Sequence, residues 1–138
     1  CDSDEISLDA DLAIAIFRVF QETLTNISKH ANASRIQVKL VELEGLVLLE
    51  VMDNGCGITE IDMKKQDSFG IRGMRERCLQ LKGNFHISGE SEKGTKVTIL
   101  IPTGDLEYHS EQSYNLNNKF KEFSQSESVR KRKQISLL

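Results

Sequence analysis

Apolar residues recur every three or four positions between Asp11 and Ala31, in a segment that contains neither glycine nor proline. The members of this stripe are Leu12, Ile16, Val19, Phe20, Leu24, Ile27 and Ala31. This spacing predicts an amphipathic helix. Asp9 or Asp11 is expected to cap its start, and Asn32 is a suitable residue for its end.

In two later regions, apolar and polar residues alternate with the two-residue period of a β-strand. Apolar and polar side chains alternate over Ile36–Leu40, and the mostly apolar run Leu46–Met52 follows after a short turn. A second pair is predicted over Phe85–Ser88 and Lys96–Ile101, which flank the turn Glu90–Gly94. Each pair is expected to form two antiparallel strands.

The segment between these pairs, Asp53–Gly73, carries four glycines and many polar residues. It is predicted to be a loop, followed by a second helix that begins at Ile71 or Met74 and stops at Gly83, a typical residue after a helix end. The order helix, two strands, loop, helix, two strands predicts an α/β fold. We expect a two-layer sandwich with the helices on one face of a mostly antiparallel sheet.

The chain of 138 residues is long enough for one compact domain. The apolar pattern stops at Pro102, so the domain is assigned to residues 1–102. Residues 103–138 are polar and end near the basic cluster Arg130–Lys133. They are expected to form a flexible or weakly helical C-terminal extension.

Composition excludes several classes of function. The formal net charge is −3, whereas proteins that coat nucleic acid are basic. The longest apolar run, Leu46–Met52, is far shorter than the ~20 residues of a membrane helix, and no export signal is visible. Cys1, Cys56 and Cys78 lack the spacing of a disulfide framework or zinc site, so a reducing, cytoplasmic setting is expected.

Three polar clusters are candidates for chemistry, and the first lies on the first helix. At about 100° per residue, Glu22, Asn26 and Lys29 fall within roughly 60° of one another beside the apolar stripe. Oxygen ligands suit a magnesium ion, and a lysine suits phosphate oxygens. The alternative interpretation is an ordinary solvated helix face.

The second cluster, Asp53–Ile58, directly follows a buried strand. A carboxylate there can accept a hydrogen bond from an exocyclic amine, and the glycines let the backbone approach a flat ring. Equally, Asp-Asn-Gly is a common turn sequence.

The third cluster, Gly70–Arg77, places glycines at the start of a helix, where unpaired N–H groups favour an anion. It matches neither a P-loop nor a dinucleotide fingerprint, and a plain loop remains the alternative.

Taken in order, the clusters resemble the catalytic domain of sensor histidine kinases. Phe17–Ala31 resembles the N box of that family, Asp53–Gly57 its first glycine box and Phe69–Arg77 its second. Gly94–Ile99 resembles the closing Gly-Thr strand. The resemblance covers about residues 10–102, which is nearly the whole predicted core.

The resemblance implies the Bergerat ATP-binding fold, a mostly antiparallel mixed sheet covered by helices and shared with DNA gyrase, mismatch-repair ATPases and heat-shock chaperones. Residues 59–69 would form the ATP lid. This short lid and the Gly70–Arg77 run are similar to the nitrate-sensor-like subfamily.

The resemblance also implies roles for single residues, with ATP and Mg²⁺ as cofactors. Asn26 would coordinate Mg²⁺, Glu22 would support that site as catalytic residue and candidate metal ligand, and Asp53 would bind the adenine amine with help from Thr95. Lys29 and His30 would contact the phosphates or the ribose side. The other residues expected to contact ATP are Gly55, Gly57, Ile58, Gly70, Ile71, Gly73 and Met74.

By the same resemblance, the chain would transfer the γ-phosphoryl group of ATP to a histidine in a separate dimerisation domain, for relay to a response regulator. His30, His86 and His109 lack the setting of a phosphoacceptor, so the chain is expected to be a catalytic fragment. It would act in the cytoplasm or as the cytoplasmic part of a membrane-bound sensor. Direct contact with nucleic acid is not expected, and any membrane contact would come from other parts of the parent protein.

Two other functions remain open at the level of sequence. A Bergerat-fold ATPase or an anti-sigma-type serine kinase would share the pocket, and in an ATPase Glu22 would act as general base for water. A non-catalytic interaction module would retain the pocket without the chemistry.

Overall fold

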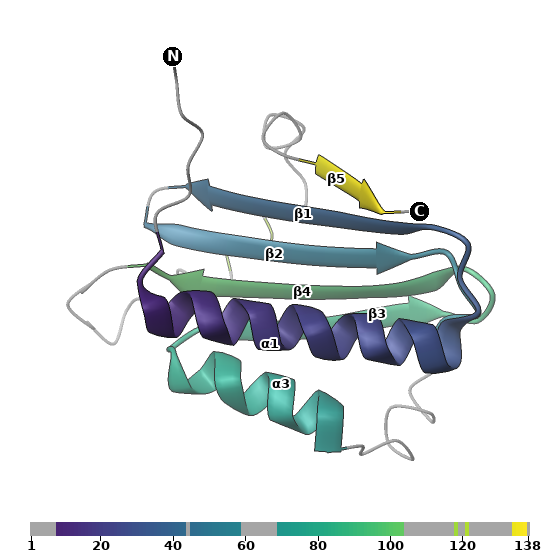
Figure 1. Cartoon of the computed structure of the whole chain (residues 1–138), viewed down its shortest axis with the longest axis horizontal. Helices are drawn as coiled ribbons and strands as arrows, with labels where there is room; N and C mark the ends of the chain where they lie inside the picture. The colour runs from purple at the N-terminus through teal and green to yellow at the C-terminus, as the bar shows by residue number, and fades with distance from the viewer. Residues whose placement is uncertain are drawn as a thin grey trace.

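A computed structural model of the chain describes residues 8–43, 45–58, 69–103, 118, 121 and 134–137 (Figure 1). The elements are α1 (Ala10–Asn26), a π-helical turn (Ile27–Ala31), β1 (Ile36–Leu43), β2 (Leu46–Asp53), α3 (Phe69–Gln80), β3 (Asn84–Glu90), β4 (Gly94–Pro102) and β5 (Gln134–Leu137). The sheet order is β3-β4-β2-β1-β5, and all of these pairings are antiparallel. With α1 and α3 on one face, this is the predicted two-layer α/β sandwich.

Helix α1 begins where the sequence predicts, and the helical segment formed by α1 and the π-helical turn ends at the predicted Asn32. The Asp9 carboxylate accepts a hydrogen bond from the backbone N–H of Leu12 at 2.9 Å, which is the expected N-terminal cap. Asn32 takes the left-handed conformation, with φ 48°, and ends the helix. The sequence did not predict that the last turn, Ile27–Ala31, is π-helical.

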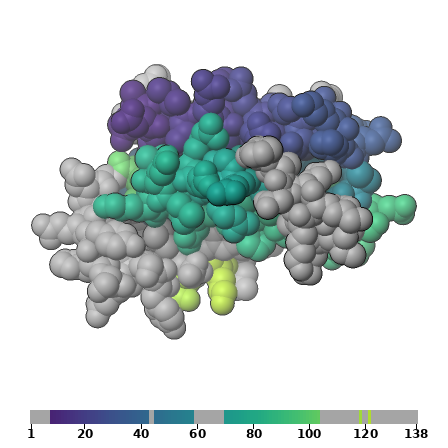
Figure 2. Space-filling view, turned by 90° about the horizontal axis from the view of Figure 1, so that it is seen from below, coloured from purple at the N-terminus to yellow at the C-terminus, as the bar shows by residue number. Residues whose placement is uncertain are grey.

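The main core lies between the sheet and the two helices, which pack alongside each other (Figure 2). Its buried members include Val19 from α1, Val51 from β2, Met74 and Cys78 from α3, and Ile99 from β4. Burying one such aliphatic side chain contributes roughly 1.5–3 kcal/mol, so this layer supplies much of the stability. A second, smaller cluster consists of Leu46, Leu48 and Leu100.

The boundaries of α3 differ from the prediction. The helix begins at Phe69, ahead of Ile71 and Met74, and it ends at Gln80. Lys82, with φ 58°, takes the left-handed position that Gly83 was expected to fill. Gly83 is required for a different reason: a Cβ at this buried position would lie 2.7 Å from the carbonyl oxygen of Leu100.

The fifth strand was not predicted. Gln134–Leu137 pairs with Ile36–Lys39 of β1, although the sequence analysis expected a flexible or weakly helical extension here. The only local signal is the alternation Gln-Ile-Ser-Leu, which is short and directly follows a basic cluster. Asn118 and Lys121 are helical, and residues 104–117, 119–120, 122–133 and 138, like residues 59–68 of the predicted lid, lie outside the described residues. Within the described part of the chain, no helix has the length and apolar character needed to cross a membrane.

Candidate functional site

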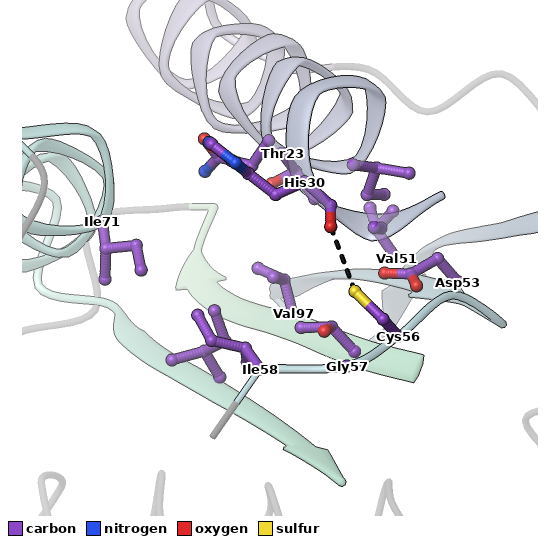
Figure 3. A pocket seen from close by; sticks show the side chains of 14 residues that line it. Thr23, His30, Val51, Asp53, Cys56, Gly57, Ile58, Ile71 and Val97 are labelled. Carbon is purple, nitrogen blue, oxygen red and sulfur yellow. Dashed lines mark hydrogen bonds between the residues drawn. The ribbon is translucent and has the colours of Figure 1, made fainter. Parts of the chain in front are cut away.

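A cavity of about 220 Å³ lies between the C-terminal part of α1, the end of β2, the strands β3 and β4, and the first turn of α3 (Figure 3). Asn26, Asp53 and Ile71 all line it, so residues from the three predicted clusters meet in one place. His30, Gly57, Ile58 and Thr95, also predicted, complete this set. Most of the remaining wall is aliphatic, which suits a flat apolar ring.

Asp53 ends β2 as a nearly buried carboxylate, with 8% of the residue exposed. Its Oδ1 accepts a hydrogen bond from the backbone N–H of Gly55 at 2.8 Å, which fixes the orientation of the carboxylate. Among the residues that the structure describes, none donates to Oδ2. A charged acceptor is therefore held at the cavity wall, where it can bind an amine of a ligand strongly.

Thr95 lies beside Asp53 because of the sheet register. The pairing of β2 with β4 ends at Met52 and Lys96, so the next position places Asp53 and Thr95 next to each other at the end of the ladder. Both residues line the cavity. This arrangement supports the prediction that they act on the same ligand group.

The turn after Asp53 is pressed against the end of α1. A Cβ on Gly55 would lie 2.1 Å from the carbonyl oxygen of Ala31, so only glycine fits this position. The backbone N–H of Cys56 donates to the same carbonyl at 2.8 Å, and its thiol donates to the carbonyl of His30 at 3.0 Å. Gly55 therefore shapes the site through this packing, whereas it is not one of the residues that line the cavity.

Asn54 ties this turn to the connection between α1 and β1. Its Oδ1 accepts hydrogen bonds from the backbone N–H groups of Ser34 at 3.0 Å and Arg35 at 2.8 Å. Its Nδ2 donates to the Ser34 hydroxyl at 2.9 Å. The sequence indicates only a turn residue at Asn54, because nothing local to it shows which backbone groups the side chain contacts.

The π-helical turn changes which residues of the first cluster face the cavity. A π turn closes hydrogen bonds from i to i+5, so each residue advances by less than the roughly 100° of an α-helix. The rotation leaves His30 on the wall with Asn26, whereas Lys29 is exposed and is not a lining residue. The regular-helix estimate that grouped Lys29 with Asn26 is corrected for this reason.

Glu22 lies at the contact between the two helices. A Cβ on Gly70 would be 2.3 Å from Oε1 of Glu22, so this carboxylate packs directly on the first turn of α3. A negative charge is favoured there, because the first N–H groups of a helix lack partners within it. Gly70 is in that first turn, whereas Gly73 is one turn further in, where its N–H is expected to join the helical ladder.

Met74 does not face the cavity. The side chain is completely buried in the core, and the hydroxyl of Thr23 lies 3.5 Å from its sulfur. Thr23 lines the cavity, whereas Met74 does not, and the Thr23 hydroxyl donates to the carbonyl of Val19 at 2.8 Å. The phase of α3 turns the Met74 side chain toward the sheet and away from the cavity, and a contact of Met74 with the ligand stays a prediction.

The described residues include no cluster of three or more histidine, cysteine, aspartate or glutamate side chains that would hold a metal ion by themselves. Mg²⁺ is commonly bound by one or two protein oxygens together with substrate phosphates. Asn26 at the wall and Glu22 one turn earlier on α1 are oxygen donors of this kind. The donor set therefore fits Mg²⁺ delivered with a phosphate ligand.

Comparison with known proteins gives consistent results. Residues 11–105 match the family described as "Histidine kinase-, DNA gyrase B-, and HSP90-like ATPase". The sensor protein VraS of Staphylococcus epidermidis is 35% identical over 95 residues, which are 69% of this chain and 27% of that protein. VraS of Staphylococcus aureus is 34% identical over 87 residues, or 63% and 25% of the two chains. The chain thus spans about a quarter of the length of these relatives.

Solved structures show the same fold. The histidine kinase domain of the Erythrobacter litoralis EL346 blue-light activated histidine kinase superposes with a TM-score of 0.64 and 27% identity, over 83% of this chain and 55% of that one. The Acinetobacter baumannii histidine kinase AdeS gives a TM-score of 0.56 at 20% identity, over 67% and 47% of the two chains. The second likeness concerns the fold alone.

Proposed function

The chain belongs to the histidine kinase-, DNA gyrase B- and HSP90-like ATPase family, and we propose that it binds MgATP as the catalytic domain of a two-component sensor histidine kinase. The observation that carries this proposal is the single cavity lined by Asn26, Asp53 and Ile71. Three segments that are far apart in the sequence meet there, and each is a candidate for a different part of the nucleotide.

The adenine ring is assigned to the aliphatic end of the cavity. Asp53 supplies a fixed acceptor for the exocyclic amine, and Thr95 stands beside it at the end of the sheet. Val51, Ile58 and Val97 offer the apolar contacts that a purine needs. Gly57 lines the same end, and its φ of 75° together with its close approach to the Glu90 carbonyl requires glycine there.

The phosphates are assigned to the side of the cavity where α1 and α3 meet. Asn26 and Glu22 would hold Mg²⁺, which neutralises the charge of the β- and γ-phosphates when it is bound. His30 lies at the wall, and the N–H of Gly70 is in the first turn of α3, which favours an anion. Lys29 and Gly73 do not line the cavity, and they would contact the phosphates at its rim.

The chemistry needs few reactive side chains in this domain. Phosphoryl transfer depends mainly on positioning and charge neutralisation, so the accepting histidine can come from a separate dimerisation domain. The resulting phosphohistidine would supply a response regulator. We propose a cytoplasmic location for the domain, and the run Gly70–Arg77 supports the proposal that it belongs to the nitrate-sensor-like subfamily.

Reconstitution tests the proposal. We expect the chain, mixed with the dimerisation domain of its parent kinase and γ-labelled ATP, to place an acid-labile, base-stable label on that domain. Asn26→Ala should reduce the label strongly, because it removes the side-chain oxygen that is proposed to hold Mg²⁺. Rapid phosphate release without such a label would instead favour an ATPase in which Glu22 is the base.

A further inference from the structure

The outer edge of β1 is covered by the end of the same chain. β1 pairs along its whole length with β2 on one side, and on the other side Ile36–Lys39 pairs with Gln134–Leu137 of β5. Figure 1 shows β5 as the last strand of the sheet, beyond β1. Without β5, the backbone groups on this side of β1 would be a free edge.

We propose that the outer edge of β1 is a strand-docking edge that the C-terminal strand β5 caps in cis, and that a second copy of this chain pairs there when β5 is removed. The sequence of β1, Ile-Gln-Val-Lys-Leu-Val-Glu-Leu, carries one positive and one negative charge and contains neither proline nor glycine. Segments of this kind have high β-propensity and low net charge, and they pair readily with copies of themselves when an edge is exposed.

The path of the chain allows this cap to form within one molecule. β4 ends at Pro102 opposite Leu46 of β2, and β5 begins at Gln134 opposite Lys39 of β1. Crossing from β4 to β5 spans three strand spacings, or roughly 15 Å, and a connection of about 30 residues can reach much further than that. Because β5 is tethered, it meets the edge at an effective concentration far above that of a second copy in a micromolar solution.

Two pairs of variants test this cap. The first pair compares the full chain with a chain that ends at Lys133. The second compares a double variant, Ile135→Pro with Ser136→Pro, against a control, Ile135→Val with Ser136→Thr. Consecutive N–H groups of a strand point to opposite sides, so one of the two prolines must remove a donor that faces β1. The control keeps both donors and favours a strand.

We expect the full chain and the control to sediment as monomers, with slow amide exchange in Ile36–Lys39. The shortened chain and the proline variant should exchange at least ~10-fold faster in this segment and should associate as the concentration rises. A synthetic peptide of residues 134–138, added in excess, should suppress the association. A thermal unfolding transition shows which variants fold. If the shortened chain does not fold, the proline variant provides the test.

Two results would overturn the proposal. One is unchanged exchange and a monomeric state in both disrupted variants, which would mean that β5 neither protects nor blocks the edge. The other is a full chain that is already dimeric with protected β1 amides, which would place the strand on a second copy and not in cis. Neither result bears on nucleotide binding, so the proposed function is tested separately.

Discussion

The carboxylate of Glu22 on α1 rests on Gly70 in the first turn of α3, so closely that a methyl group on Gly70 would come within 2.3 Å of Oε1. This contact joins the helix that carries the N-box residues to the helix that begins beside the cavity. The absence of a side chain at residue 70 therefore leaves room for this carboxylate at the start of α3.

Alanine substitutions in α3 test this contact. Gly73→Ala should stabilise the fold by about 0.5–1 kcal/mol, because alanine favours a helix and the new methyl group would meet only the flexible end of Arg77. Gly70→Ala should give no gain, because its methyl group must displace Glu22 from the start of α3. In a Glu22→Ala background, Gly70→Ala should become stabilising. Equal gains for both alanines in the parent, measured by urea unfolding, would refute the contact.

Asn54 should contribute to stability through its three hydrogen bonds to Ser34 and Arg35. Asn54→Ala removes all three, and a loss of about 1–2 kcal/mol is expected because the bonds are exposed. Asn54→Asp keeps the two bonds to Oδ1, and the Ser34 hydroxyl can rotate and donate to the new oxygen, so this variant should lose no more stability than Ser34→Ala, within ~0.5 kcal/mol. Urea unfolding of the three variants checks this order, and a loss in Asn54→Asp as large as in Asn54→Ala would contradict it.

Cys78 gives the protein a pH-dependent stability. Burial raises the pKa of this thiol from 9.0 to about 11. The folded state thus retains the proton in a pH range where the unfolded state loses it, so the free energy of unfolding should fall by up to about 1.4 kcal/mol per pH unit between pH 9 and pH 11. Cys78→Ala should lower stability at neutral pH but show a shallower fall. Denaturant titrations at several pH values measure this fall. Identical slopes of the unfolding free energy against pH for parent and variant would exclude Cys78 as its source.

The two described cysteines should also differ in reactivity. Cys56 is exposed and lines the cavity, whereas Cys78 is buried. In a Cys1→Ser background, iodoacetamide should label Cys56 first, and a non-hydrolysable ATP analogue with Mg²⁺ should slow that labelling. Mass spectrometry of the labelled peptides gives both rates. Labelling of Cys56 at an unchanged rate under saturating nucleotide would place the ligand elsewhere.

Local signals explain what the sequence could predict. The cap at Asp9, the exit at Asn32 and the alternation in β2 and β4 each depend on neighbouring residues, and the structure confirms them. The resemblance to histidine kinase catalytic domains also predicted that Asn26 and Asp53 would belong to one pocket, and both line the cavity.

The remaining features depend on tertiary contacts. The π-helical turn moves Lys29 off the cavity wall, and periodicity of a regular helix cannot show this. Met74 was expected at the ligand, but the packing of α3 against the sheet buries it. β5 pairs with β1, which lies about 100 residues away in the sequence, so four alternating residues gave too weak a local pattern.

Calorimetric titration of the parent and Asp53→Asn with a non-hydrolysable ATP analogue and Mg²⁺ tests the central claim most directly. Asparagine has the same shape and can keep the bond from Gly55, but its amide nitrogen would then face the adenine amine with a donor where an acceptor is required. We predict at least ~30-fold weaker binding, about 2 kcal/mol, with an unchanged thermal unfolding midpoint. Equal affinity for the two proteins would contradict the account of this cavity as an adenine site.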